Sequence, residues 1–280
     1  MLHQQDHFES HDGLRLYRQC WLPERESTAV VVLVHGFTEH GGRYAAVAAE
    51  LCRHGYAVYA LDLRGHGRSE GERVFVRCFD EFLDDLEIFV RWVRQCEPGK
   101  GLFLLGYSMG GTIAARFVVT RHADFRGLVL AAPAAQVGRG VFPLLRRLAS
   151  VVSRICPRLK IVRLGSAWVS RDAEVVAEFR SDPLVFHGRF PVRIGAEILR
   201  TGAEMLDQAS AIRLPLLVLQ GTGDRVVDPG GARRLCTRAA SEDKTLQLYE
   251  GIYHDLLHEP EKDQVIADLI AWLDHRLATR

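Results

Sequence analysis

The sequence predicts an α/β fold in which helices cover both faces of a mostly parallel sheet. Two observations lead to this prediction. Short apolar runs rich in branched residues recur along the chain, as is typical of strands buried on both faces. Segments in which apolar residues recur at three and four positions separate these runs, as in amphipathic helices. Strand and helix in alternation indicate a parallel sheet, and 280 residues are enough to bury a sizeable core.

The expected strands and helices follow each other in this alternating order. The chain opens with a hairpin at the sheet edge, built from Phe8–Ser10 and Leu14–Cys20 around an Asp-Gly turn. The later strands are expected at Ala29–Val34, Ala57–Leu61, Gly101–Leu105, Gly127–Ala131, Leu214–Gln220 and Leu246–Tyr249. The helices are expected at Tyr44–His54, Phe79–Cys96, Thr112–His122, near Gly231–Ala240 and at Lys262–Leu277.

One segment interrupts the alternation. Between Ala134 and about Arg213 no strand-like run is flanked by turns, and the pattern is mainly helical. Such an excursion between two core strands is an insertion on one end of the sheet. We therefore expect residues 1–133 and 214–280 to form the core and residues 134–213 to form a helical cap.

A nucleophile motif comes directly after the strand Gly101–Leu105. Gly106-Tyr107-Ser108-Met109-Gly110 matches G-x-S-x-G and leads into a helical run. This context is that of a nucleophile elbow, a sharp turn that projects the serine hydroxyl above the sheet. Glycine two residues to either side removes Cβ atoms that would clash there, and the helix that follows points its N-terminal dipole at a developing oxyanion. We predict Ser108 as the nucleophile rather than an exposed serine in a glycine-rich turn.

The other two members of a catalytic triad are expected in the chain order serine, acid, histidine. Asp224 and His254 each come a few residues after one of the last two expected strands. Both therefore lie at the carboxyl edge of the sheet, where open α/β sheets gather their sites. We predict that His254 is the general base and that Asp224 orients it. Asp228 is the rival acid, but it precedes a proline and a helical run, which favours a helix N-cap.

The loops after two earlier strands complete the expected site. The loop His35-Gly36-Phe37 follows a buried strand, and we expect the backbone N–H groups of Phe37 and Met109 to form the oxyanion hole. His35 is expected to turn this loop through a hydrogen bond rather than to act as a second base. The loop Asp62–Ser69 lacks the glycine spacing and the lysine of phosphate-binding loops, so it is predicted to be structural.

Composition and charge exclude several classes of function. The formal net charge is +1, which gives no reason to expect nucleic acid as a partner. The uncharged stretches are too short for a span of roughly 20 apolar residues. The first ten residues lack the apolar core of a signal peptide, so a cytoplasmic location is expected.

The cysteines and histidines give no sign of a metal site. The six cysteines are scattered, which predicts buried thiols rather than disulfides or ligands. The remaining histidines, including His122, His187 and His275, show no metal-ligand spacing. No metal and no cofactor are expected.

At its motifs the sequence closely resembles a known family, the monoacylglycerol lipase and lysophospholipase branch of α/β hydrolases. The segments that carry the resemblance are His35–Tyr44, Asp62–Gly71, Gly106–Gly111, Tyr253-His254 and, in the cap, Ser170–Asp172 and Asp182–Leu184. The resemblance covers nearly the whole chain and implies the α/β-hydrolase fold. It also implies hydrolysis of a single-chain lipid ester, foremost of monoacylglycerol to glycerol and fatty acid, through an acyl-enzyme on Ser108.

The same resemblance implies where the substrate lies. The acyl chain is expected in a tunnel under the cap, and the glycerol end in a small polar pocket. On that pattern Glu39 contacts the glycerol hydroxyls, and the alternative is a loop salt bridge with Arg43. Relatives near the mammalian enzyme carry a second histidine one helical turn after the catalytic one. His258 has a different spacing here, so we do not transfer that role.

The first half of the cap is basic and carries an apolar stripe. It holds no acidic residue between Ala134 and Arg171. Its cations are Arg139, Arg146, Arg147, Arg154, Arg158, Lys160, Arg163 and Arg171, and its apolar stripe is Val141, Leu145, Leu148, Val152 and Ile155. A helix of this kind lies in a membrane interface and favours anionic lipid, or it packs on the core and roofs the tunnel. The sequence leaves both roles open.

Other functions remain as alternatives to the monoacylglycerol lipase. A lysophospholipase or a general carboxylesterase would use the same residues. A serine aminopeptidase needs acidic residues to hold the substrate ammonium, which the basic part of the cap lacks, although Glu174 and Glu178 follow later. A non-catalytic binding protein of this fold commonly loses a member of the triad, whereas here every role is filled. The sequence predicts no oligomeric state.

Overall fold

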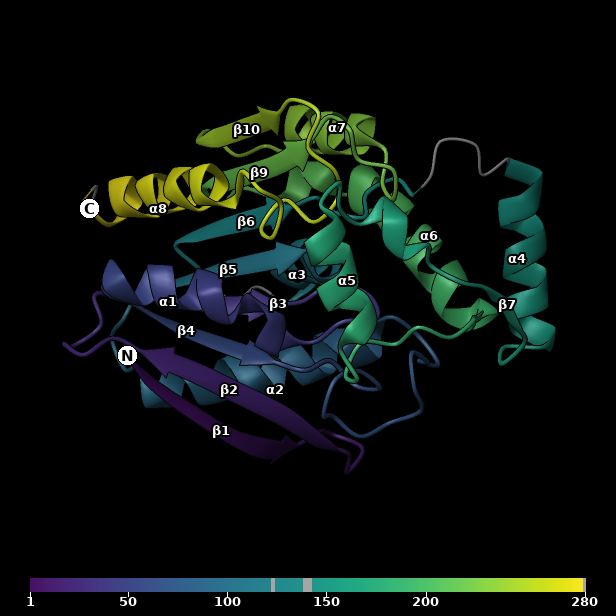
Figure 1. The fold of residues 1–280 in the computed structure, drawn as a ribbon, viewed down its shortest axis with the longest axis horizontal. Coiled ribbons are helices and arrows are strands. Elements are labelled where there is room, and N and C mark those ends of the chain that lie inside the picture. Colours follow the sequence, from purple (N-terminus) through teal and green to yellow (C-terminus); the bar gives the residue numbers. More distant parts are fainter. Residues whose placement is uncertain (122–123, 138–142, 279–280) are drawn as a thin grey trace.

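A computed structural model describes residues 1–121, 124–137 and 143–278; of residues 143–148 and of Ile161 only the backbone is described. Eight strands in this part of the chain form one sheet in the order β1-β2-β4-β3-β5-β6-β9-β10 (Figure 1). The strands are β1 (Leu2–Glu9), β2 (Arg15–Leu22), β3 (Ala29–Val34), β4 (Tyr56–Leu61), β5 (Leu102–Tyr107), β6 (Gly127–Ala131), β9 (Leu216–Gly221) and β10 (Lys244–Tyr249).

The sheet is mostly parallel, as predicted. The neighbours from β4 to β10 in the sheet order all pair in parallel. Only β2 runs against both of its neighbours, β1 and β4. The β1–β2 hairpin therefore forms one edge of the sheet, and the carboxyl ends of the parallel strands meet at a common edge.

Helices cover both faces of the sheet. One face packs against α1 (Ala45–Arg53) and α8 (Lys262–Ala278), and the other against α2 (Asp80–Cys96), α3 (Met109–Thr120) and α7 (Pro229–Arg238). In β3 the alternate residues Val30, Val32 and Val34 join the second core, while Ala29, Val31 and Leu33 join the first. Because neighbouring side chains of a strand point to opposite faces, a strand between two helical layers must be apolar throughout. The predicted α/β fold is confirmed.

The segment between β6 and β9 lies beyond the carboxyl ends of the strands (Figure 1). We call residues 134–213 the cap. It contains α4 (Pro143–Ile155), β7 (Lys160–Val162), α5 (Ala173–Ser181), β8 (Phe190–Pro191) and α6 (Val192–Asp207). The strands β7 and β8 pair with each other, whereas the sequence pattern indicated no strand in this segment. β7 has three residues and β8 has two, which is too short to produce a periodic pattern.

The second half of the cap is tied to the loops that surround the site. The Phe186 N–H donates to the Thr38 carbonyl oxygen at 2.8 Å, and His40 Nε2 lies 2.8 Å from Asp182 Oδ2. Arg171 binds Glu259 of the core at 2.7 Å. The predicted basic and apolar positions Arg139 and Val141, like His122, lie outside the described residues.

Two further expectations concern the chain as a whole. Within the described residues, no helix combines the length and apolar character needed to cross a membrane. All six cysteines are free thiols, as expected, but the prediction that they are buried holds for only half of them. The exposed ones are Cys78, Cys96 and Cys156.

Candidate active site

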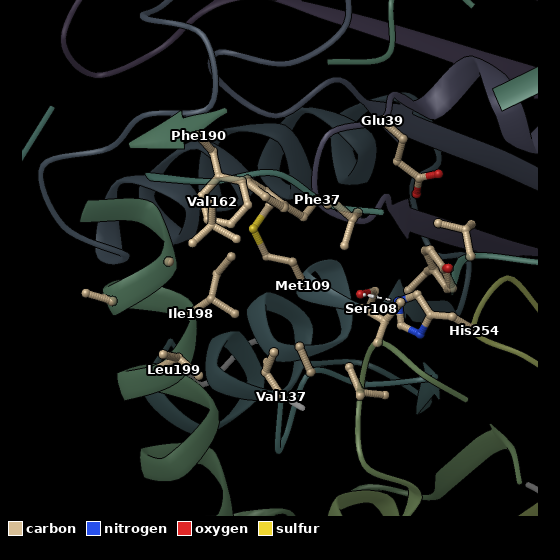
Figure 2. A pocket seen from close by; sticks show the side chains of 18 of the residues that line it. Phe37, Glu39, Ser108, Met109, Val137, Val162, Phe190, Ile198, Leu199 and His254 are labelled. Carbon is tan, nitrogen blue, oxygen red and sulfur yellow. Dashed lines mark hydrogen bonds between the residues drawn. The ribbon is translucent and has the colours of Figure 1, made fainter. Parts of the chain in front are cut away.

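Ser108, His254 and Asp224 form one hydrogen-bonded chain at the carboxyl edge of the sheet. Asp224 Oδ2 lies 2.7 Å from His254 Nδ1. Ser108 Oγ lies 2.8 Å from His254 Nε2 (Figure 2). Because Nδ1 faces a carboxylate, that nitrogen carries the proton and Nε2 is left to accept the serine hydroxyl proton. The three side chains thus have the geometry and the tautomer of a catalytic triad.

The turn at Ser108 has the strained backbone of a nucleophile elbow. Ser108 has φ 53° and ψ −116°, a backbone conformation that residues other than glycine rarely adopt. A Cβ at Gly106 would lie 2.3 Å from the Gly110 carbonyl oxygen, and one at Gly110 would lie 2.1 Å from the Val34 carbonyl oxygen. Both glycines are therefore required by close backbone approach. The serine itself is only 6% exposed.

Asp224 is held by more than its histidine. Oδ1 accepts hydrogen bonds from the backbone N–H groups of Val226 and Val227, and Oδ2 accepts one from Gln220 Nε2 at 3.0 Å. These donors fix the carboxylate in place, which in turn orients the imidazole. Asp228 instead caps α7, since its Oδ1 accepts from the Gly230 N–H at 2.9 Å.

The charge of Asp224 controls the protonation of His254. Burial alone would lower the pKa of His254, but the negative charge of Asp224 and its hydrogen bond outweigh this effect and raise the pKa above its usual value of 6.5. The imidazolium that forms when Ser108 gives up its proton is therefore stabilised.

Phe37 and Met109, the residues predicted to form the oxyanion hole, both line the cavity that contains Ser108. Met109 is the first residue of α3, so its N–H has no partner within the helix, and Phe37 lines the same cavity as Ser108. His35 Nε2 accepts from the Leu63 N–H at 2.9 Å, and Nδ1 then donates to the Gly36 carbonyl oxygen at 2.7 Å. His35 thus joins two loops and has no nitrogen left for catalysis.

The loop after β4 is likewise structural. Both oxygens of Asp62 accept backbone N–H groups, from Gly41 at 2.8 Å and from Arg68 at 2.9 Å. This carboxylate connects the loop to the 3₁₀ turn Gly41–Tyr44 before α1, and no hydrogen bond described for it reaches a triad residue.

A cavity of about 310 Å³ lies between the core and the cap and contains Ser108 and His254 at one end (Figure 2). Its polar lining is confined to the region of Ser108, His254, Glu39 and Arg43. The apolar lining comes from both the core and the cap, and includes Phe37, Met109, Val137, Val162, Val169, Phe179, Phe190, Ile198, Leu199 and Val227. The rings of Phe37 and Phe190 pack edge to face with their centroids 5.1 Å apart, which closes one wall of the cavity.

Glu39 forms an ion pair inside this cavity wall. Arg43 Nη1 donates to Glu39 Oε2 at 2.7 Å, while the Gly36 N–H and the Tyr44 hydroxyl both donate to Oε1 at 2.7 Å. The loop salt bridge considered from the sequence is therefore present, and the same carboxylate also faces the cavity. Sequence reasoning missed that Arg43 Nη2 also binds Asp255, at 2.8 Å.

Asp255 and Gln220 are the site residues that the sequence analysis did not single out. Gln220 is a polar residue at the end of a buried strand, which could have marked it as a partner of the acid. Asp255 and Arg43 are 212 positions apart, and no local pattern predicts their contact. Within the described residues, no three His, Cys, Asp or Glu side chains are grouped so as to hold a metal ion.

Comparisons with known proteins agree with this geometry. A family model described as "Serine aminopeptidase, S33" matches residues 25–261. The monoacylglycerol lipase of Mycolicibacterium smegmatis is 39% identical over 93% of this chain and 93% of its own, and the monoglyceride lipase of Homo sapiens is 35% identical over 98% and 91%. The crystal structure of the Paleococcus ferrophilus monoacylglycerol lipase matches with a TM-score of 0.85 at 31% identity, covering 93% of this chain and 99% of the other.

Fold, site and relatives together define an enzyme, a serine hydrolase of the α/β-hydrolase fold. Within that class, the chain belongs to the serine aminopeptidase S33 family. The resemblance to monoacylglycerol lipases that the motifs indicated is confirmed over nearly the whole chain.

Proposed function

We propose that this protein hydrolyses monoacylglycerols to glycerol and a fatty acid. The observation that carries the proposal is the cavity, whose lining is apolar except at the end that holds Ser108, His254, Glu39 and Arg43. A single acyl chain matches the apolar part, and glycerol hydroxyls match the carboxylate and the guanidinium. The names of the relatives in Mycolicibacterium smegmatis and Homo sapiens support the same substrate.

The triad accounts for the first half of the reaction. Ser108 Oγ attacks the ester carbonyl carbon while His254 Nε2 takes the hydroxyl proton. The carbonyl oxygen becomes an oxyanion, which the N–H groups of Phe37 and Met109 stabilise. When the oxyanion collapses, the bond to the glycerol oxygen breaks, and this oxygen takes the proton from His254.

The second half repeats these steps with water. Water attacks the acyl-enzyme carbonyl carbon and gives a proton to His254 Nε2. The bond to Ser108 Oγ then breaks, the serine takes the proton back, and the fatty acid leaves. The apolar lining excludes other water from the acyl chain, which strengthens the hydrogen bonds of the triad.

The family description raises the aminopeptidase alternative, and the cavity argues against it. The one carboxylate among the cavity-lining residues described is Glu39, and Arg43 already compensates its negative charge. The neighbouring guanidinium would repel a substrate ammonium group. A lysophospholipase or a general carboxylesterase would share the triad and differ only in the head group accepted at the polar end.

A substrate series tests the proposal. Long-chain monoacylglycerols are expected to be hydrolysed in preference to lysophosphatidylcholine and to aminoacyl-nitroanilides. Ser108→Ala should lower turnover by roughly 10⁴- to 10⁶-fold and abolish labelling by a fluorophosphonate probe. Faster turnover of aminoacyl-nitroanilides than of esters would contradict the proposal, as would ester hydrolysis by the alanine variant within tenfold of the wild type.

We further propose that the cap contacts lipid surfaces. Among the cap side chains that the structure describes, five large apolar ones are about half or more exposed: Val151, Ile155, Leu159, Val162 and Trp168. Val162 also lines the cavity, so the apolar exterior leads into the site. Arg154, Lys160 and Arg163 are exposed among them, which favours an anionic surface.

Vesicle co-sedimentation tests the lipid contact. Replacing Ile155 and Trp168 by serine is expected to weaken binding to vesicles by roughly tenfold or more, because each buried apolar side chain contributes about 1.5–3 kcal/mol. Leu2→Ser, at an equally exposed position on β1, serves as the matched control. Charge reversal at Arg154 and Lys160 should weaken binding to phosphatidylglycerol vesicles at low salt only. If the wild type ignores anionic vesicles at low salt, the cap only roofs the cavity.

Of the predicted basic and apolar positions, the side chains of Arg146, Arg147, Leu145 and Leu148 lie outside the described residues. Arg158 and Arg171 instead form ion pairs with Glu72 and Glu259 of the core. The cytoplasmic location stays a prediction from the sequence.

A further inference from the structure

Four ionisable side chains form a cluster in the wall of the active site: Glu39, Arg43, Asp255 and His258. Arg43 joins the two carboxylates, with Nη1 2.7 Å from Glu39 Oε2 and Nη2 2.8 Å from Asp255 Oδ2. The Asp255 side chain is fully buried and that of His258 is 17% exposed. Asp255 directly follows His254 in the chain, so the cluster adjoins the general base.

Both ring nitrogens of His258 face oxygen acceptors. Nδ1 lies 2.6 Å from Asp255 Oδ1, and Nε2 lies 3.0 Å from the carbonyl oxygen of Arg43. A neutral imidazole carries one N–H, so one of these contacts would place a nitrogen lone pair against an oxygen. Only the imidazolium donates to both. The ring of Tyr44 packs edge-on at 5.5 Å and adds no charge.

The charges of the cluster balance only when His258 is protonated. Two carboxylates then face one guanidinium and one imidazolium. Burial alone would lower the pKa of His258, but the charge and hydrogen bond of Asp255 outweigh burial and the repulsion of Arg43, so the pKa is raised. Burial would raise the pKa of Asp255, but the charges of His258 and Arg43 hold it far below its usual range. A neutral His258 would leave an uncompensated buried negative charge.

That extra charge would act on the general base. Asp255 and Glu39 both favour the protonated form of His254, and so raise its pKa beyond the effect of Asp224. A protonated His254 cannot accept the proton of Ser108. An uncompensated Asp255 would therefore hold more of the enzyme in an inactive form at neutral pH.

We propose that His258 is a positioning residue that is protonated at neutral pH, whose charge neutralises Asp255 beside the general base and whose two hydrogen bonds hold Asp255 and Arg43 in the cavity wall. The role rests on the proposed function of His254. The protonation state itself does not, and it can be measured on inactive protein.

The first test is the protonation of His258 in the wild type. Nitrogen NMR of protein labelled in its histidines should show both His258 ring nitrogens protonated at pH 7.5, with the ring signals assigned by correlation to the backbone of His258 in the wild type. A neutral ring at this pH would overturn the proposal, whether or not the protein hydrolyses monoacylglycerols. If the protein shows no hydrolase activity while His258 is charged, only the proposed function fails.

The second test is the pH profile of kcat/KM for a water-soluble ester. His258→Gln cannot carry the charge and should move the acid limb upward by roughly one pH unit. The double variant Asp255→Asn with His258→Gln removes both charges and should return the limb toward its wild-type position. His54→Gln, an exposed histidine on the same face of the sheet, is the matched control. Loss of activity in His258→Gln without a shift of the limb would overturn the role; if that variant does not fold, the NMR measurement decides.

Discussion

Each ring nitrogen of His254 has one hydrogen-bond partner, and these two partners identify the acid and the nucleophile. The carboxylate of Asp224 binds Nδ1 and is itself held by Gln220 and by two backbone N–H groups. The acid therefore cannot rotate away, and Nε2 stays directed at Ser108. The function of His254 as general base therefore depends on which carboxylate binds its Nδ1.

Asp224→Asn should lower kcat by roughly 10⁴-fold, because an amide in that place favours the wrong imidazole tautomer. Asp228→Asn should change kcat only a few-fold, since asparagine caps a helix about as well as aspartate. Steady-state kinetics on a soluble ester compares the two variants, and thermal melting checks that both are folded. The opposite ranking would mean that Asp228 is the acid.

The raised pKa of His254 predicts the pH dependence of activity. As pH falls through this pKa, the imidazole becomes protonated and can no longer accept the serine proton. The acid limb of kcat/KM should therefore lie above pH 6.5, the usual pKa of histidine. The pH profile of soluble-ester hydrolysis measures this limb. A profile that stays flat down to pH 4 would exclude a histidine base.

Among the elements, α6 determines how much room the acyl chain has. It carries Gly195 in its interior, where glycine is less favourable than alanine by about 0.5–1 kcal/mol. A Cβ at this position would lie 3.2 Å from the ring of Phe190, and both residues line the cavity. The missing side chain thus leaves space in the cavity.

Gly195→Leu should narrow the cavity and shift the preference toward short acyl chains. If overpacking raises the free energy of the bound long acyl chain by about 1–3 kcal/mol, kcat/KM for a long-chain monoacylglycerol falls by roughly 5- to 150-fold. Hydrolysis of a butyryl ester should stay near the wild-type rate, and Gly195→Ala should give an intermediate effect. Equal losses for long and short chains would show that the position affects folding rather than specificity.

The elements also show what the sequence could and could not predict. The ends of the strands buried on both faces were predicted to within one or two residues. Such a strand must be apolar throughout, so its apolar run marks where it begins and ends. The start of α3 was placed three residues late, since the glycines after Ser108 obscure the helical pattern. In the site, the triad followed from chain order and strand ends. The cluster of Arg43, Asp255 and His258 did not, because its contacts join residues more than 200 positions apart.

For the whole molecule, a buried arginine ties the edge hairpin to the core. Arg64, which is 3% exposed, donates to Asp85 of α2 and to Asp12 in the turn between β1 and β2. Burial acts to raise the pKa of Asp12, but the hydrogen bonds from Arg64 and Ser10 outweigh it and lower the pKa from 3.8 to about 2. Because the folded pKa is depressed, this carboxylate stabilises the fold above its unfolded pKa, and the contribution is lost as pH falls.

Asp12→Asn should therefore lower the melting temperature at pH 7 but have little effect near pH 2. The difference between wild type and variant should shrink across the interval from pH 3.8 to about 2. Melting curves recorded by circular dichroism at several pH values measure this difference. A difference that does not change with pH would mean that the carboxylate contributes by shape and not by charge.

The chain leaves the sheet after β6 and returns to it at β9, and these two strands are paired neighbours. The cap is therefore connected to the sheet at the ends of two neighbouring strands. A recombination event that replaced it would leave the pairing within the eight-stranded sheet intact, and Ser108, Asp224 and His254 all lie outside the exchanged segment. The hydrogen bonds between cap and core restrict what fits, among them those of Asp182 and Phe186 with the loop after β3 and that of Arg171 with Glu259. Exchange of one continuous stretch of the gene would therefore change the cap side chains that line the cavity, and with them the substrates accepted. The stretches that encode Ser108, Asp224 and His254 would not be exchanged.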